Sequence, residues 1–196
     1  MNRSTMFGPT FISRRHGMTL PELMVTLVVA AILLALAVPS MRELIARKRV
    51  EGVANELAND LRYLRSVSAQ RNEIVQIGFK SNSSVTCYVL NTAGNGAGAC
   101  DCTRSAQPIC TAIPGSSEEL KSVVLPRSNG VTIIPDATNT GTMSLQGASG
   151  LPSGGNLIQV TVRSDLGGMV RVFTDGVARP TVCSILGHEP NLRACQ

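Results

Sequence analysis

The longest apolar stretch of the chain lies near the N-terminus and predicts one membrane-spanning helix. Residues 18–38 read MTLPELMVTLVVAAILLALAV, and the interruptions in the run are Thr19, Pro21, Glu22 and Thr26. At about 1.5 Å per residue, a helix of this length crosses a hydrocarbon core about 30 Å thick. Arg14 and Arg15 precede the run. The positive-inside rule therefore places the N-terminus in the cytoplasm and the rest of the chain in the periplasm or exterior.

After Pro39 the pattern becomes amphipathic. Apolar residues recur at spacings near three and four among many charges, at Met41, Leu44, Ile45, Val53, Leu57, Leu61, Leu64 and Val67. This periodicity predicts that one long helix continues beyond the membrane, with residues 39–70 as its amphipathic part. Because Pro39 lacks a backbone donor, we expect a bend where the apolar and amphipathic parts meet. The apolar stripe of residues 53–67 needs a sheet to cover it.

The remaining residues, 71–196, favour strands. Alternating and β-branched patterns predict seven of them, at residues 74–79, 85–90, 120–125, 131–134, 157–163, 169–174 and 181–185. Residues 91–117 and 147–155 are rich in small and turn-forming residues and predict loops. The sequence thus predicts an α+β fold, in which a long N-terminal transmembrane and amphipathic helix packs on an antiparallel β-sheet globular domain.

Composition argues against catalysis. The chain has two histidines, and His16 precedes the apolar run in a segment that we expect to be removed, which leaves His188 alone. A histidine-based triad or a multi-histidine metal site would need unusual substitutes. We therefore predict a protein that is not an enzyme and that needs no cofactor or metal. A membrane-anchored hydrolase that uses His188 is the alternative from that class.

The net charge of +5 is less informative than its distribution. Arg3, Arg14 and Arg15 supply three of the positive charges before residue 18, and downstream the chain has 15 basic and 13 acidic residues. This balance gives weak general attraction to nucleic acid or anionic lipid. Any such binding must come from a local cluster.

All six cysteines follow the apolar run, on the side assigned to an oxidising compartment. An even number suits disulfides, and six cysteines allow fifteen pairings. A bond between Cys183 and Cys195 is a plausible local closure, and the other four, Cys87, Cys100, Cys102 and Cys110, would staple the loop after the second strand. The alternative is a zinc site made by Cys100, Cys102 and Cys110, whose spacing lacks paired Cys-x-x-Cys knuckles.

The junction between the basic prefix and the apolar run carries a family resemblance. An ordinary secretory signal is cut after its apolar stretch, whereas here the small residue in the charged context, Gly17, stands before it. The segment RRHG, followed by MTLPE and the apolar run, resembles the type IV pilins and the pseudopilins of secretion systems. The resemblance implies that a prepilin peptidase removes residues 1–17 and that the amine of Met18 is then methylated.

The same resemblance gives roles to Glu22 and Pro39. They become the fifth and twenty-second mature residues, where the family carries a glutamate and many pilins a helix-bending proline. A carboxylate in an apolar helix costs roughly 2.5–3.5 kcal/mol and needs a partner. The resemblance implies that Glu22 pairs with the amine of Met18 on an adjacent subunit and sets the axial register. Alternatively, Glu22 lies at the interface near the helix N-terminus, where the helix dipole favours a negative charge.

Within the family, two segments are similar to the branch that contains FimT, FimU and GspH. They are residues 57–79, a helix-to-strand junction, and residues 167–183, a closing hairpin. This resemblance implies a minor pilin that acts in pilus assembly or initiation. Its partners would be other major and minor pilins and the prepilin peptidase. It would be a single-pass inner-membrane protein of bacteria with a periplasmic C-terminal domain, and part of the pilus fibre after assembly.

Two other functions stay open. One is a GspH-like pseudopilin of a type II secretion system. The other is a DNA-binding minor pilin for DNA uptake, with Arg163, Arg171, Arg179 and Arg193 as an electropositive strip. Some DNA-uptake members carry Gly-Arg-x-Arg on the closing hairpin, and here residues 176–179 read GVAR, without the first arginine. Acidic residues among these arginines and few aromatic rings also weigh against DNA binding.

Overall fold

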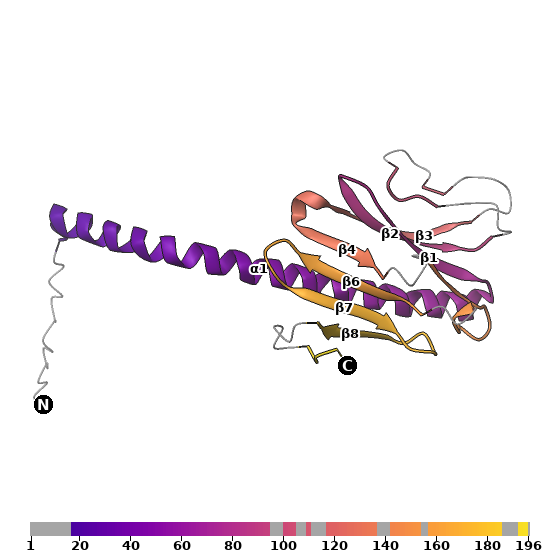
Figure 1. Ribbon diagram of the computed structural model, residues 1–196. Helices are drawn as coiled ribbons and strands as arrows, with labels where there is room; N and C mark the ends of the chain where they lie inside the picture. The colour runs from indigo at the N-terminus through magenta and orange to yellow at the C-terminus, as the bar shows by residue number, and fades with distance from the viewer. Residues whose placement is uncertain are drawn as a thin grey trace, which may run out of the picture. The chain divides into compact units, whose positions relative to one another are not determined.

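One helix accounts for both the apolar and the amphipathic N-terminal patterns. The computed structural model describes residues 17–94, 100–104, 109–110, 117–136, 142–153, 157–185 and 192–195. Its helix α1 runs without interruption from Leu20 to Arg71 and includes Pro39 (Figure 1). The chain divides into two compact units, Met1–Ser40 and Met41–Gln196.

In the first unit, none of the described residues covers the helix. Every large apolar side chain between Met18 and Val38 is exposed, from 45% at Val38 to 72% at Leu20. The hydroxyls of Thr26 and Ser40 donate to the carbonyls of Leu23 and Ala37, each at 2.9 Å. Such internal bonds satisfy polar groups where no water is present. By length and composition this helix can cross a membrane.

The described residues of the second unit form two antiparallel sheets (Figure 1). The first has the strand order β3-β2-β1-β5. Its strands are β1 (Val75–Ser81), β2 (Val85–Thr92), β3 (Glu119–Pro126) and β5 (Thr142–Leu145). The second has the order β4-β6-β7-β8. Its strands are β4 (Val131–Pro135), β6 (Gln159–Ser164), β7 (Met169–Thr174) and β8 (Pro180–Ser184). A single 3-10 turn, η1 (Arg127–Asn129), leads from β3 into β4.

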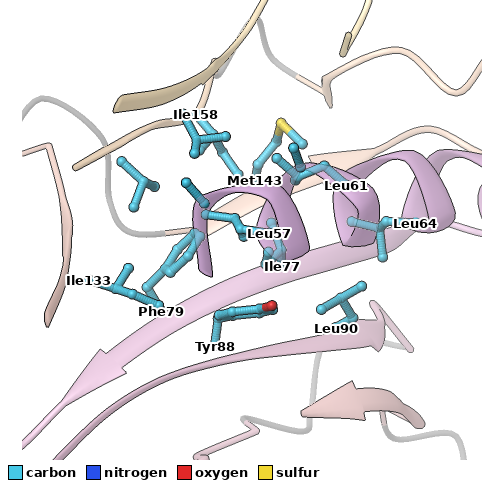
Figure 2. Packing of buried hydrophobic residues seen from close by; sticks show 14 of the residues in the cluster. Leu57, Leu61, Leu64, Ile77, Phe79, Tyr88, Leu90, Ile133, Met143 and Ile158 are labelled. Carbon is cyan, nitrogen blue, oxygen red and sulfur yellow. The ribbon is translucent and has the colours of Figure 1, made fainter. Parts of the chain in front are cut away.

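The core forms where the apolar stripe of α1 meets both sheets. Helix residues at spacings of three and four are buried, namely Val50, Ala54, Leu57, Leu61 and Leu64. Figure 2 shows Leu57 and Leu61 among side chains from both sheets. The first sheet contributes Ile77, Phe79, Tyr88, Leu90 and Met143, and the second contributes Ile133, Val160, Val162, Val170 and Val172. The stripe predicted to need a sheet is therefore covered by two.

The α+β class is as predicted, with two differences within the sheets. Each of the seven predicted strands is present, with ends that differ by at most two residues. The prediction missed β5, because four residues with apolar side chains only at Met143 and Leu145 give too short an alternation. The prediction also placed all strands in one sheet, whereas the described strands form two. An alternating pattern shows which face of a strand is buried, but it does not show which strand pairs with which.

One buried polar group joins α1 to the first sheet. The carboxylate of Asp60, which is 6% exposed, accepts a hydrogen bond of 2.8 Å from the hydroxyl of Tyr88. It also accepts hydrogen bonds of 2.7 and 2.8 Å from the Lys121 ammonium, which reaches Glu56 at 3.3 Å. A buried charge is tolerated when it is paired and hydrogen-bonded in this way.

The same contacts shift two pKa values. Burial, and then the hydrogen bond to Asp60, raises the pKa of Tyr88 far above its ordinary value. The hydrogen bond to Asp60 raises the pKa of Lys121. In each case the protonated form is the one that the folded state stabilises.

We expect Asp60→Ala to destabilise the second unit by about 2–4 kcal/mol, because it leaves the buried Tyr88 hydroxyl without a partner and removes the main acceptor of Lys121. Glu56→Ala is the matched control, since Glu56 is an exposed carboxylate on the same helix that contacts the same lysine. We expect it to lower stability by about 0–1 kcal/mol. Denaturant unfolding of the full chain in mild detergent, followed by circular dichroism, measures both. Equal losses in the two variants would contradict the anchoring role of Asp60.

Alkaline pH should destabilise the fold through the same residues. When the pKa of a group is higher in the folded state than in the unfolded state, the group stabilises the fold. This stabilisation is complete at pH values below the pKa of the unfolded state, about 10 for tyrosine and lysine, and it is lost as the pH rises through the pKa of the folded state. In Tyr63→Phe, Tyr88 is the one tyrosine left, since the chain has two. We expect its phenolate absorbance to appear in alkali only together with loss of the circular dichroism signal. Phenolate that forms while the fold is intact would contradict this.

Candidate assembly segment and arginine groups

The segment predicted to be cut is open in the structure. Gly17, Met18 and Thr19 precede the first residue of α1 and are exposed. No described atom lies within 4 Å of the position that a Cβ on Gly17 would take. The fold therefore gives no steric reason for glycine at this position, and a requirement for it would come from an enzyme that binds the segment.

Glu22 caps the N-terminus of α1. The backbone N–H of Thr19 donates to Oε2 of Glu22 at 3.5 Å, and the N–H of Leu23 donates to the carbonyl of Thr19 at 3.1 Å. A threonine followed three residues later by a glutamate is the pattern of a capping box, of which this is one half. Pro21 fits here because a first-turn N–H needs no partner within the helix.

The single chain thus gives Glu22 a local role at the helix terminus. Its predicted pairing with the amine of a neighbouring subunit stays a prediction. Pro39 lies within α1 and has no N–H to donate to the carbonyl of Ala35, yet the helix continues beyond it. The bend expected there also stays a prediction.

Three disulfides occupy the six cysteines. Cys183 is bonded to Cys195, the pair that the sequence favours. Cys87 is bonded to Cys102 and Cys100 to Cys110. These bonds use the thiols that the alternative zinc site needs. Within the described residues, no group of three metal-ligating side chains comes together.

The first two disulfides hold the loop after β2 against the first sheet. Cys87 and Val89 alternate along β2 with Tyr88 and Leu90, so they face away from α1. They pack with Cys102 and Ile109 from the loop in a small second cluster. Within the loop, hydrogen bonds from the Thr103 side chain and N–H to Asp101 lower the pKa of that carboxyl. The loop is therefore a fixed outer layer of the sheet where the structure describes it.

Three of the four arginines predicted to form a strip belong to the outer face of the second sheet. Arg163 is opposite Met169 and Arg171 is opposite Thr161, so the two arginines are diagonal neighbours on β6 and β7. Arg193 lines a cavity of about 230 Å³ with Phe173, Thr181 and the Cys183–Cys195 disulfide. The Nε of Arg171 is buried and has no hydrogen-bond partner among the described atoms. His188, the other residue singled out in this part of the chain, lies outside the described residues.

The fourth arginine, Arg179, belongs to a different group. It ends the turn from β7 to β8, in which Oδ1 of Asp175 accepts the N–H groups of Val177 and Arg179 at 3.0 and 2.8 Å. Beside it, Ala178 has a positive φ of 58° and a buried methyl group. Arg179 lines a groove of about 570 Å³ together with two arginines of α1, Arg62 and Arg65. We call this the α1–β8 groove.

Sequence reasoning missed Arg62 and Arg65. Both lie next to residues of the buried stripe, Leu61 and Leu64, and their spacing of three places them together on a neighbouring face of the helix. That spacing is visible in the sequence. What the sequence does not show is that the turn after β7 brings Arg179 to the same face.

Comparison with known proteins gives two findings. Residues 12–38 match the model of the prokaryotic N-terminal methylation motif. This segment contains Gly17, Met18 and Glu22 and ends with the apolar run. Among solved structures, the chain is similar to the type IV minor pilin FimU of Pseudomonas aeruginosa, with 13% identity and a TM-score of 0.48 over 69% of this chain and 89% of that chain. No curated protein matches the chain.

Proposed function

We propose that this chain, which its N-terminal methylation motif makes a member of the type IV pilin superfamily, is a minor pilin that acts as a structural subunit in pilus assembly. The observation that carries the proposal is the position of the motif at the head of a helix whose large apolar side chains, as far as Val38, are all exposed. An apolar surface on every side of a helix needs lipid or other helices around it. A subunit that passes from the membrane into a bundle of kindred helices meets that need in both places.

Processing is the first step of this function. A prepilin peptidase would cut between Gly17 and Met18, where the chain is exposed and precedes the helix. The apolar helix then stays attached to the second unit, instead of being lost as in an ordinary secretory signal. The amine of Met18, methylated in the mature protein, becomes the new terminus.

Glu22 would then set the register between subunits. In the single chain its carboxylate accepts one long hydrogen bond and makes no ion pair within the described residues. When helices bundle and water leaves, a carboxylate needs a stronger partner. The positive terminus of a neighbouring Met18 supplies that charge, and the pair forms at one axial offset.

The compartment follows from the helix and the disulfides. Three disulfides in the second unit favour an oxidising compartment, because cytosolic thiols are kept reduced. Together with Arg14 and Arg15 before the apolar run, they favour a single-pass inner-membrane protein with its second unit in the periplasm. After assembly that unit would lie in the pilus fibre.

A GspH-like pseudopilin of a type II secretion system would use the same helix and the same processing, and it differs from a minor pilin in its partners. DNA uptake receives less support. Arg163, Arg171 and Arg193 belong to the outer face of the second sheet and Arg179 to the α1–β8 groove, so the four do not form one strip. We therefore favour the structural subunit.

We expect coexpression with a prepilin peptidase to shorten the protein by the 17 residues before Met18 and to add one methyl group. Gly17→Val should block the cut, because the peptidase accepts a small residue there. Gly52→Ala is the matched control. Gly52 lies on α1, and a Cβ added there also has no described atom within 4 Å. We expect this variant to be cut as the wild type is. Intact mass decides. A mature protein that begins beyond Val38, or that keeps Met1, would contradict the proposal.

Glu22 variants separate the two roles of this carboxylate. Glutamine can still cap a helix at this position but carries no charge. We expect Glu22→Gln and Glu22→Ala both to be processed and both to be recovered in sheared fibres about tenfold less than wild type. Glu43→Gln, at an exposed glutamate farther along α1, should be recovered normally. Normal recovery of Glu22→Gln would show that capping is the whole role of Glu22.

A further inference from the structure

The α1–β8 groove is lined by three arginines and by smaller residues that carry no charge. Arg62, Arg65, Ser66 and Ala69 line it from α1, and Ala178, Arg179 and Pro180 line it from the end of the turn and the start of β8. The helix residues follow spacings of three and four, so they form one face beside the buried stripe. Both sides of the groove belong to the second unit.

Within the part of the chain that the structure describes, its three arginines form no ion pair. The ion pairs of the described residues involve Arg47, Lys48, Arg71 and Lys121, and none involves Arg62, Arg65 or Arg179. Arg62 donates one hydrogen bond, of 2.7 Å, to the neutral amide of Asn59. Arg65 passes over Gly150, where an added Cβ would lie 3.1 Å from its Cγ. Three positive charges thus line one groove, and no acidic side chain is among the described residues that line it with them.

The strand at the groove offers backbone groups as well. β8 is an edge strand that pairs with β7 on one side. On its other side, the described pairing is a single bridge between Ser184 and Ala194 at the far end of the strand. On that other side, the start of β8, which borders the groove, has no partner strand within the described residues, although its first residue, Pro180, has no N–H to donate. An extended chain in the groove could therefore use both guanidinium and backbone groups.

These features fit an acidic peptide better than a nucleic acid. Guanidinium groups bind carboxylates through paired hydrogen bonds. The other residues that line the groove, namely Ser66, Ala69, Ala178 and Pro180, include no aromatic ring on which a base could stack. Three arginines would also neutralise few phosphates, and the other arginine group belongs to the outer face of the second sheet.

We propose that the α1–β8 groove is a docking site for an acidic, extended segment of a neighbouring pilin subunit. The proposal rests on the proposed function for the identity of the partner, whereas the acidic chemistry follows from the groove itself. Arg62, Arg65 and Arg179 bind the carboxylates, and Ala69 and Pro180, which are not buried, contact the side chains between them.

The test measures peptide binding to the full chain in mild detergent. The probes are a fluorescent peptide of alternating Glu and Ala, its counterpart of alternating Gln and Ala, and a labelled oligothymidylate of equal length. The test variant combines Arg62→Gln, Arg65→Gln and Arg179→Gln. The control variant removes three exposed positive charges elsewhere, with Arg49→Gln, Lys80→Gln and Arg104→Gln. Circular dichroism establishes that both variants are folded.

We expect the acidic peptide to bind the wild type and the control variant, and the test variant to bind at least about tenfold more weakly. Binding should weaken with salt, and the Gln-containing peptide should bind less. Equal binding of the two peptides, or equal loss in both variants, would overturn the proposal. Tighter binding of oligothymidylate that the test variant loses would replace it with a phosphate site.

A second measurement separates this proposal from the proposed function. The test variant should still be cut after Gly17, because its substitutions lie outside the processed segment, and it should be recovered less in sheared fibres than the control variant. Failure of processing in the wild type would remove the pilin function and leave the peptide result standing. Normal recovery of the test variant in fibres would show that the groove does not bind a subunit.

Discussion

The hydrogen bonds of Asp60 fix how α1 is rotated against the first sheet. Successive residues of an α-helix point about 100° apart, so a rotation by one residue would exchange the buried stripe for its neighbours. Asp60 can meet both Tyr88 and Lys121 from one rotation alone. Apolar burial favours the stripe of Leu57, Leu61 and Leu64 over other faces, and the polar contact makes that choice specific.

The same rotation determines where the arginines of α1 lie. Because Leu61 and Leu64 are buried, Arg62 and Arg65 are carried to the face that borders β8. The turn after β7 meets them there because Ala178 adopts a left-handed conformation, which turns its methyl group into the core and leaves Arg179 at the groove. A contact between α1 and the first sheet therefore positions a surface that lies between α1 and the second sheet.

Helix α1 has two patterns of apolar residues, and each pattern suits a different environment. Between Met18 and Val38 apolar residues surround it, so no single face can be covered and every side needs an apolar neighbour. From Val50 onward the apolar residues narrow to a stripe, which the sheets of the same chain cover. This change in pattern is why the helix could be predicted from the sequence throughout its length, since each pattern is periodic over several turns.

The sheets could be predicted less completely. Strands with several alternating residues, such as β7 with its valines at 170 and 172, show their buried face directly. Strand β5 does not, because it has only two apolar residues. They are recognised as part of a strand only through the pairing with β1, which lies about 65 residues away in the sequence. The disulfides divide in the same way. Cys183 and Cys195 are the last two cysteines of the chain and lie far from the other four in sequence, whereas Cys87, Cys100, Cys102 and Cys110 fall in one short stretch. The pairing of those four depends on how the loop folds onto β2.

The arginines show what such missing information does to a functional prediction. Arg163, Arg171, Arg179 and Arg193 fall within one C-terminal stretch of the sequence, and proximity alone joins them in one strip. Strand pairing places Arg163 and Arg171 on an outer face, while the turn before β8 directs Arg179 toward α1. A basic surface made from residues about 115 positions apart in the chain is invisible to any local pattern. The described residues that line this groove include no carboxylate and no aromatic ring. The first absence favours an acidic occupant, and the second favours a peptide over stacked bases.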